Sequence, residues 1–287
     1  MRLSLPQRDI EFPRRPLLMG IVNVNDDSFS GDGTLDFSEA LAQAKAQIEA
    51  GADIIDVGAE SARTNREAVS VEEELRRFAG FLEGWQGVIG SAKPRDAEQL
   101  WPPMLSANTW RSEVIEQLLS KGGIELLNDM SALPDERNAK ACAEHGAALL
   151  IMHSVGEPKV AHTHQQWGDV MGSMNEFFEE KIAMAKSAGL DEERIVLDPG
   201  IEFAKQRDDN LTVYRELEQL KDFGLPVLVP VSRKTVIGEV LSIDEPKERD
   251  AGTVACIAAA MKRGAQIFRV HNVDAAWQAV KVLNALA

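Results

Sequence analysis

The hydrophobic pattern of the chain is a series of short apolar runs that alternate with longer amphipathic segments. Within most runs the apolar residues are continuous, which is typical of strands buried on both faces of a parallel sheet. The predicted strands lie at residues 17–24, 53–59, 103–108, 125–129, 148–154, 195–200, 226–233 and 266–272. A helical pattern follows each strand, over roughly 36–50, 70–84, 111–121, 135–145, 169–188, 209–222, 248–263 and 273–285.

Eight strand–helix pairs in 287 residues predict an α/β fold, a single-domain (β/α)8 TIM barrel. A doubly wound open sheet is the main alternative, but that fold usually begins with a glycine-rich phosphate-binding turn after its first strand. No such turn follows residues 17–24. We therefore expect an N-terminal extension over residues 1–16 and the barrel over residues 17–287.

The charge and the cysteines limit the classes of partner. The chain has 31 Lys and Arg against 46 Asp and Glu, a formal net charge of −15, which argues against nucleic-acid binding. Its two cysteines, Cys142 and Cys256, lie in apolar helical patterns and have no zinc-site spacing. No segment resembles a signal peptide or approaches the roughly 20 apolar residues of a membrane span. We expect a cytoplasmic protein that binds neither nucleic acid nor a membrane.

Polar residues stand at the carboxyl end of nearly every predicted strand, where TIM barrels carry their active sites. In chain order they are Asn23; Asp56, Glu60 and Ser61; Asn108; Asn128 and Asp129; Met152 and His153; Asp198; Ser232, Arg233 and Lys234; and Arg269 and His271. Each alone is compatible with turn chemistry, but together they predict a ligand site at the mouth of the barrel.

Cationic residues gather on the last two strands. Lys234, Arg269 and His271, with Arg233 by position, stand where barrels commonly bind phosphate. Arg269 and His271 alternate with Val270, so they share one face of a strand. In so acidic a chain this cluster indicates a phosphate, pyrophosphate or carboxylate ligand, the alternative being a solvated loop.

Acids and amides end other strands. The carboxylate of Asp198 and the amide of Asn128 suit the N–H donors of an amino-pyrimidinone ring such as a guanine or pterin. A salt bridge to a neighbouring strand is the alternative for Asp198. Asn23 can offer a carbonyl oxygen to Mg²⁺, which proteins usually hold through few oxygens plus substrate phosphates. His162 and His164 form a weaker candidate metal pair.

Six ordered segments resemble the motifs of the dihydropteroate synthase family of pterin-binding TIM barrels. They are MGIVNVNDDSFS (19–30), GADIIDVGAESAR (51–63), LLNDMSAL (126–133), IVLDPGIEFAK (195–205), VPVSRKTVIG (229–238) and GAQIFRVHNV (264–273). The resemblance implies a folate-biosynthesis transferase that joins 4-aminobenzoate to 6-hydroxymethyl-7,8-dihydropterin pyrophosphate. It further implies SN1-like departure of pyrophosphate assisted by Mg²⁺, a sulfonamide target and a homodimer.

The same resemblance implies a role for individual residues. Asn23 would hold Mg²⁺ and pyrophosphate, and Ser232 would lie near the aminobenzoate carboxylate. The implied catalytic residues are Arg63, Lys234, Arg269 and His271, and the implied substrate-binding residues are Ala62, Asn108, Asn128, Met152, Asp198, Ser232 and Lys234.

Three segments depart from the family pattern. The third strand of the family usually ends Val-Asp-Thr, and its Asp contacts the pterin, whereas residues 107–109 are Ala-Asn-Thr. The loops at 25–33 and 60–65 also differ, and their family counterparts close over the aminobenzoate. Two alternative hypotheses therefore stand beside the synthase: a pterin-binding paralogue that is non-catalytic or uses another amine, and a methyltetrahydrofolate methyltransferase.

Overall fold

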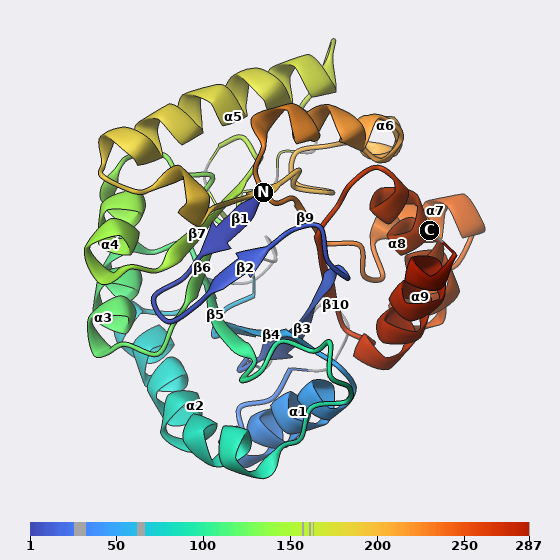
Figure 1. The fold of residues 1–287 in the computed structure, drawn as a ribbon. Helices are drawn as coiled ribbons and strands as arrows, with labels where there is room; N and C mark the ends of the chain where they lie inside the picture. The colour runs from blue at the N-terminus through green and yellow to red at the C-terminus, as the bar shows by residue number, and fades with distance from the viewer. Residues whose placement is uncertain (26–32, 62–66, 157, 161, 163, 287) are drawn as a thin grey trace.

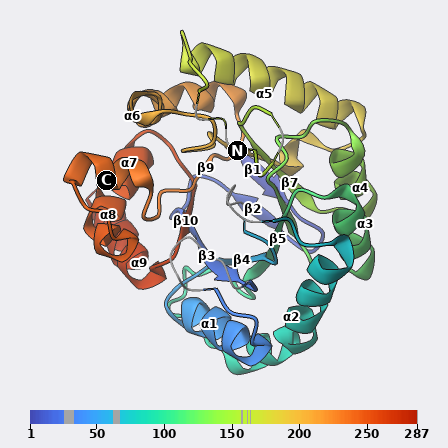
Figure 2. The ribbon, with the colours of Figure 1, turned by 180° about the vertical axis from the view of Figure 1, so that it is seen from behind.

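A parallel eight-stranded barrel surrounded by helices forms the body of the protein (Figures 1 and 2). The computed structural model describes residues 1–25, 33–61, 67–156, 158–160, 162 and 164–286. The barrel strands are β3 (Leu17–Asn23), β4 (Ile54–Gly58), β5 (Met104–Thr109), β6 (Leu126–Asp129), β7 (Ala148–Met152), β8 (Ile195–Asp198), β9 (Leu228–Val229) and β10 (Ile267–Val270).

The strands pair in parallel in the order β8-β7-β6-β5-β4-β3-β10-β9. A parallel bridge between Leu197 and Val227 joins the two ends of this order and closes the ring. The predicted TIM barrel is therefore confirmed, and every strand end named above faces the same end of the barrel.

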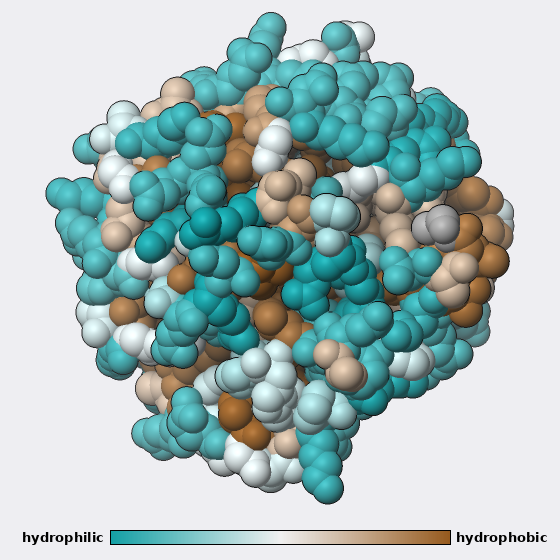
Figure 3. All heavy atoms as spheres, in the orientation of Figure 1, coloured by the Kyte–Doolittle hydropathy of each residue, from teal (hydrophilic) through white to brown (hydrophobic). Residues whose placement is uncertain are grey.

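The helices form the outer ring. Their bounds are α1 (Phe37–Glu49), α2 (Val71–Ser91), α3 (Ser112–Lys121), α4 (Arg137–His145), α5 (Val170–Ser187), α6 (Arg207–Glu216), α7 (Thr235–Leu241), α8 (Asp250–Lys262) and α9 (Val273–Ala285). Short 3-10 helices span Glu192–Arg194, Leu217–Phe223 and Pro246–Arg249. Among the described residues no helix is both long and apolar enough to cross a membrane. The face in Figure 3 is largely hydrophilic, with apolar side chains gathered on the side of the C-terminal helices.

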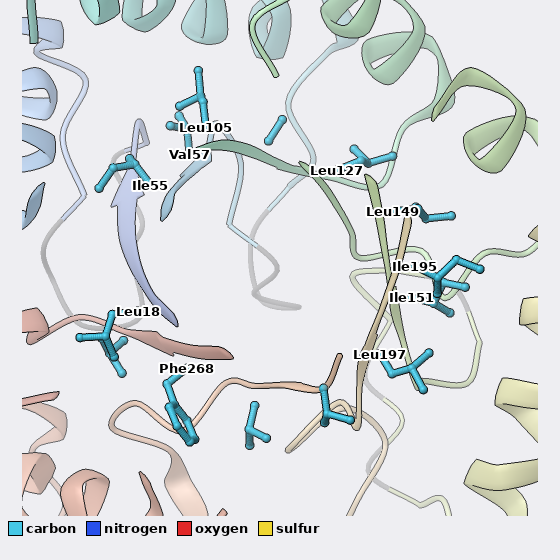
Figure 4. Close-up of a cluster of buried hydrophobic side chains, with 14 of the residues drawn as sticks. Leu18, Ile55, Val57, Leu105, Leu127, Leu149, Ile151, Ile195, Leu197 and Phe268 are labelled. Atoms are coloured by element: carbon cyan, nitrogen blue, oxygen red, sulfur yellow. The ribbon is translucent and has the colours of Figure 1, made fainter. Parts of the chain in front are cut away.

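Strand side chains divide between two apolar clusters, as alternation along a strand requires. Those that point outward, such as Leu18, Ile55 and Phe268, pack beneath the helices (Figure 4). Those that point inward near the strand starts, such as Leu17 and Ile54, form the second cluster inside the barrel. The inner cluster fills the barrel interior near the strand starts, and the cavity described below lies at the opposite end.

An antiparallel hairpin of β1 (Arg2–Ser4) and β2 (Asp9–Glu11) covers the amino-terminal end of the barrel. Leu3 and Ile10 of this hairpin are fully buried against the inner cluster. The sequence analysis did not predict these strands, because each has only three residues and a single buried apolar side chain.

Three boundaries differ from the sequence prediction. Helix α2 continues to Ser91, beyond the predicted end at residue 84, and buries Trp85. Helix α7 was not predicted, and seven residues hold too few helical turns to produce a clear period. The seventh strand, expected over 226–233, pairs regularly only at Leu228–Val229.

Candidate active site

A cavity of about 290 Å³ opens at the carboxyl ends of the strands, and all eight strands or the segments that directly follow them contribute to its wall. The predicted residues that line it are Asn23, Glu60, Ser61, Asn108, Asn128, Met152, Asp198, Ser232, Lys234, Arg269 and His271. Two more predicted residues, Ala62 and Arg63, lie outside the described part of the chain.

Asp56 of β4 connects three walls of the cavity. Its Oδ2 accepts hydrogen bonds from Asn108 Nδ2 at 3.3 Å, Asn128 Nδ2 at 3.0 Å and Arg269 Nε at 2.7 Å. Its Oδ1 accepts the Ser106 hydroxyl at 2.6 Å. The Asp56 side chain is fully buried, and the guanidinium compensates a charge that burial would otherwise make costly.

Sequence reasoning gave Asp56 no role of its own. Its position predicts only a polar end to an apolar strand, because an acid that contacts other side chains rather than the ligand leaves no distinct sequence signal. Only the register that sets β4 beside β5 brings Asp56 next to Ser106 and Asn108.

An acceptor is available at the wall of the cavity. Asn128 is buried, and its Nδ2 is used by Asp56. Its Oδ1 has no hydrogen-bond partner among the described residues. Because an unpaired buried carbonyl is costly, this atom is suited to a ligand N–H donor.

Asp198 is a second acceptor on the wall. Burial raises the pKa of its carboxyl to about 6, partly opposed by the hydrogen bond from Gly200 N at 2.7 Å and by nearby cations. The carboxylate is therefore largely ionised at pH 7 and still poorly solvated, a state that favours a ligand with N–H donors.

Lys234 lies at the start of α7 and lines the same cavity, near enough to Asp198 for the two charges to interact. Its Nζ donates to the Ile201 carbonyl at 3.0 Å and lies 3.9 Å from Glu202 Oε2. Burial lowers the pKa of this ammonium, which Glu202 and Asp198 oppose. A partly desolvated cation of this kind interacts strongly with any anion or ring that enters.

The segment after β8 carries a buried lysine that sequence reasoning missed. Lys205 Nζ donates to the carbonyl oxygens of His153, Gly200 and Phe203 at 3.0 to 3.2 Å. Burial lowers its pKa to about 7. Because these carbonyls belong to the end of β7 and to the turn after β8, Lys205 holds the turn that presents Asp198 and Phe203.

His271 and Ser232 form a pair on the last two strand ends. Ser232 Oγ accepts the His271 backbone N–H at 3.1 Å and lies 2.8 Å from the ring Nδ1. Both side chains line the cavity beside Arg269. The expected cationic side of the site thus combines Lys234, Arg269 and His271.

Three polar strand ends have structural roles instead. Arg233, which we had grouped with the cations, pairs with Asp250 of α8 at 2.7 Å. Asp129 accepts hydrogen bonds from Asn138 and Ser131 within the barrel wall. His153 packs among Trp167 and Phe177, where burial lowers its pKa. In each case a side chain of the outer layer supplies the partner, which sequence position alone does not reveal.

A buried ion network joins the loops above the cavity. Glu60, which lines the cavity, pairs with Arg111 after β5 and with Lys159 Nζ at 2.9 Å. Arg111 also pairs with Glu74 of α2 and donates to the Val69 carbonyl. The loops after β4, β5 and β7 are thereby fixed to one another.

The donors suit a magnesium ion that a substrate helps to bind. Within the described ranges no group of three or more His, Cys, Asp and Glu side chains could hold a metal ion. Asn23 lies in the cavity wall with an amide oxygen suited to a hard cation. One protein oxygen fits Mg²⁺ that is completed by phosphate oxygens and water.

Comparison with known proteins identifies the family. The sequence profile described as "Pterin binding enzyme" matches residues 19–271. The chain belongs to this family. A member named dihydropteroate synthase from Synechocystis sp. is 38% identical over 286 residues, which cover 99% of this chain and 94% of the relative.

Solved structures of the family share the whole fold. A Yersinia pestis dihydropteroate synthase with a sulfonamide drug complex superposes with a TM-score of 0.87 at 32% identity, covering 100% and 98% of the two chains. The Thermus thermophilus dihydropteroate synthase in complex with 6HMPPP gives 0.82 at 33% identity, covering 100% of both. The resemblance to dihydropteroate synthases drawn from the strand-end motifs is confirmed.

Proposed function

We propose that this transferase condenses 6-hydroxymethyl-7,8-dihydropterin pyrophosphate with 4-aminobenzoate, giving 7,8-dihydropteroate and pyrophosphate. The observation that carries the proposal is one cavity with buried acceptors, Asn128 and Asp198, and a cationic side, Arg269 and His271. A ligand with a ring rich in N–H donors at one end and a pyrophosphate at the other satisfies both sides.

The pterin ring occupies the acceptor side. Asn128 Oδ1 and the Asp198 carboxylate take its N–H donors, and Asn108 lies beside them. Lys234 lies next to the ring, and Met152 packs against it as an adaptable apolar surface. Burial makes these hydrogen bonds strong, because water does not compete for the same atoms.

The pyrophosphate occupies the cationic side. Arg269 and His271 bind its oxygens, and Arg63 is the further cation that the family motif supplies. Asn23 would contribute an oxygen to Mg²⁺, which when bound supplies charge that stabilises the leaving pyrophosphate. As the carbon–oxygen bond breaks, negative charge grows on the leaving pyrophosphate, next to these cations. Electrostatic stabilisation of this kind is the largest catalytic contribution in many enzymes.

The aminobenzoate approaches from the open end of the cavity, with its carboxylate near Ser232. Ala62 is a further aminobenzoate-binding residue that the family motif implies. Its neutral amine is already nucleophilic, so no side chain is required as a general base. Sulfonamides share the shape and polarity of aminobenzoate, and we expect them to compete for the same place.

The deciding experiment measures pyrophosphate release from dihydropterin pyrophosphate with Mg²⁺, with and without 4-aminobenzoate. Amine-dependent release, product of the mass of dihydropteroate and competitive inhibition by a sulfonamide are the expected results. Pterin binding without release would favour the non-catalytic or altered-amine paralogue, for which Asn108 is the motivating residue. Methyl transfer from a methylated folate would favour the methyltransferase.

We further propose that the enzyme is a homodimer. Helix α8 is apolar on most of its surface, which is typical of a helix covered on several sides. Val240 and Leu241 of α7 and Val282 and Leu286 near the C-terminus expose about half or more of their surface on the same side of the molecule. A second copy would cover these side chains.

Analytical ultracentrifugation tests the dimer. We expect a species of twice 31.5 kDa for the wild type and of 31.5 kDa for Leu241→Glu. Val160→Glu is the control, because Val160 is 49% exposed in the loop after β7 and away from α7. A monomeric wild type, or a dimer insensitive to Leu241→Glu but lost in Val160→Glu, would contradict this surface.

A further inference from the structure

The amides beside Asp56 have a defined orientation. A carboxylate accepts hydrogen bonds and donates none, so each amide that contacts it must present its NH₂ group. Asn108 and Asn128 both do so toward the same Oδ2. The carbonyl oxygen of each amide is therefore left for other partners, and both residues line the cavity.

The two amides differ in burial, but both direct their NH₂ group to Asp56 Oδ2. Asn128 Oδ1 is buried and has no partner within the described part of the chain. Asn108 is half-buried beside it, since the two residues are paired in the register of β5 and β6. The wall therefore offers two neighbouring acceptors that share one buried anchor.

We propose that Asp56 is a positioning residue that fixes Asn108 and Asn128 as acceptors for a ligand edge with N–H donors. The inference rests on the proposed pterin site and adds to it the orientation of both amides and the residue responsible.

Electrostatics explains how Asn can serve here. An Asp at position 108 would bring a second carboxylate to about the 3.3 Å that now separates Asn108 Nδ2 from Asp56 Oδ2, and like charges repel at this range. The amide turns that contact into a hydrogen bond and still offers one oxygen to the ligand. With Asn instead of Asp at position 108, the hydrogen bond to the ligand is not charge-assisted and is therefore weaker.

Two substitutions at position 108 separate an acceptor from a donor. Asn108→Asp keeps acceptors and removes the NH₂ group, whereas Asn108→Leu removes both at similar volume. By calorimetric titration with 6-hydroxymethylpterin, we expect Asn108→Asp to bind within about threefold of the wild type, or more tightly, and Asn108→Leu to bind at least about tenfold more weakly. Equal losses in both variants would mean that Asn108 donates to the ligand, which would overturn the proposal.

A double-mutant cycle tests whether Asp56 acts through the amide. In Asp56→Asn the anchor can also donate, so the amide at 108 is no longer held one way. We expect Asn108→Leu to weaken binding by less than about threefold in this background, against about tenfold in the wild type, since residues that act together are not additive. Additive losses would indicate a merely structural Asp56 and overturn the proposal.

Controls keep the outcomes distinct. Ser106→Ala removes a contact to the other Asp56 oxygen and should leave pterin affinity nearly unchanged; a tenfold loss there would contradict the role given to Oδ2. If Asp56→Asn does not fold, the comparison of the two position-108 variants decides alone. Failure of the wild type to bind any pterin would instead refute the proposed function.

Discussion

Asp198 shows how a single site residue can oppose stability. Its carboxyl is buried, and burial raises its pKa from 3.8 to about 6. A raised acid pKa means that the folded state prefers the protonated form. The associated stability is present at low pH and is lost as the pH rises through about 6. At neutral pH the ionised form therefore destabilises the fold while it serves a ligand.

We predict that Asp198→Asn stabilises the protein and disables binding. Between pH 4 and 6 the free energy of unfolding of the variant should rise relative to the wild type, reaching a gain of up to about 3 kcal/mol at pH 7. Urea titrations at pH 4.5 and 7.5 measure this difference. Pterin affinity at pH 7.5 should fall at least about tenfold, because a charged acceptor is lost.

Asp208→Asn is the matched control, since that carboxylate is 89% exposed on α6 and its substitution should leave the free energy of unfolding nearly unchanged. If Asp198→Asn has the same free energy of unfolding as the wild type at pH 7.5, the buried carboxylate does not destabilise the fold. Normal pterin binding by Asp198→Asn would show that the Asp198 carboxylate does not contact the pterin.

At the same scale, sequence could nominate residues but not partners. Eleven of the predicted strand-end residues line the cavity, because strand ends in a barrel must converge. Asp129, His153 and Arg233 are equally polar, but their side chains contact other residues instead of lining the cavity. Asp56 and Lys205 act on neighbours across the barrel, so their function depends on contacts between strands that are distant in the chain.

Among the elements, the loops above the cavity depend on one another. Lys159 of the β7–α5 loop reaches Glu60 at 2.9 Å and the Glu67 carbonyl at 3.3 Å, both in the segment between β4 and α2. Its side chain is only 12% exposed. The contact joins the described ends of the segment between β4 and α2 to the β7–α5 loop.

We predict that Lys159→Met loosens this connection with little effect on the core. Glu60 keeps Arg111, so its buried carboxylate is not left unpaired, and the loss in unfolding free energy should stay below the roughly 3–5 kcal/mol of a fully broken buried pair. Steady-state kinetics should show KM raised severalfold, and hydrogen exchange should increase in residues 67–70 and 154–156. Lys181→Met is the control, since Lys181 has the same 12% exposure but pairs with the exposed Glu180.

Equal kinetic effects in the two lysine variants would argue against an inter-loop role. The sequence predicts no element between the strand that ends at residue 154 and the helix that begins at residue 169, and nothing in the composition of this loop indicates which loop it contacts. Element boundaries had the same weakness: α2 was ended early because its glycine-containing last turns dilute the helical period, although Trp85 and Val88 pack into the core.

For the whole molecule, stability and chemistry occupy opposite ends of the barrel. The amino-terminal end is sealed by the β1–β2 hairpin and by a buried pair between Arg15 and Asp53 at 2.8 Å. The cavity lies at the carboxyl end, beyond the inner apolar cluster. Eight alternating strands and helices predicted the barrel, since few other folds contain so many regular units. The β1–β2 hairpin was not predicted, because its strands are short and have weak hydrophobic patterns.

The separation predicts a substitution that changes stability without changing chemistry. Leu3 is fully buried in the inner cluster, so Leu3→Ala should lower the free energy of unfolding by about 2–5 kcal/mol through lost burial and a cavity. Arg2→Ala, beside it, removes an exposed pair with Asp9 and should cost less than about 1 kcal/mol. Denaturant unfolding measures both.

The kinetic half of this prediction is the sharper one. At a temperature well below unfolding, kcat and KM of Leu3→Ala should match the wild type within about twofold, because the inner apolar cluster separates the hairpin from the cavity. A large fall in kcat with the fold intact would mean that the packing of the sealed end sets the geometry of the strand ends. The two ends of the barrel would then have to be treated as one mechanical unit.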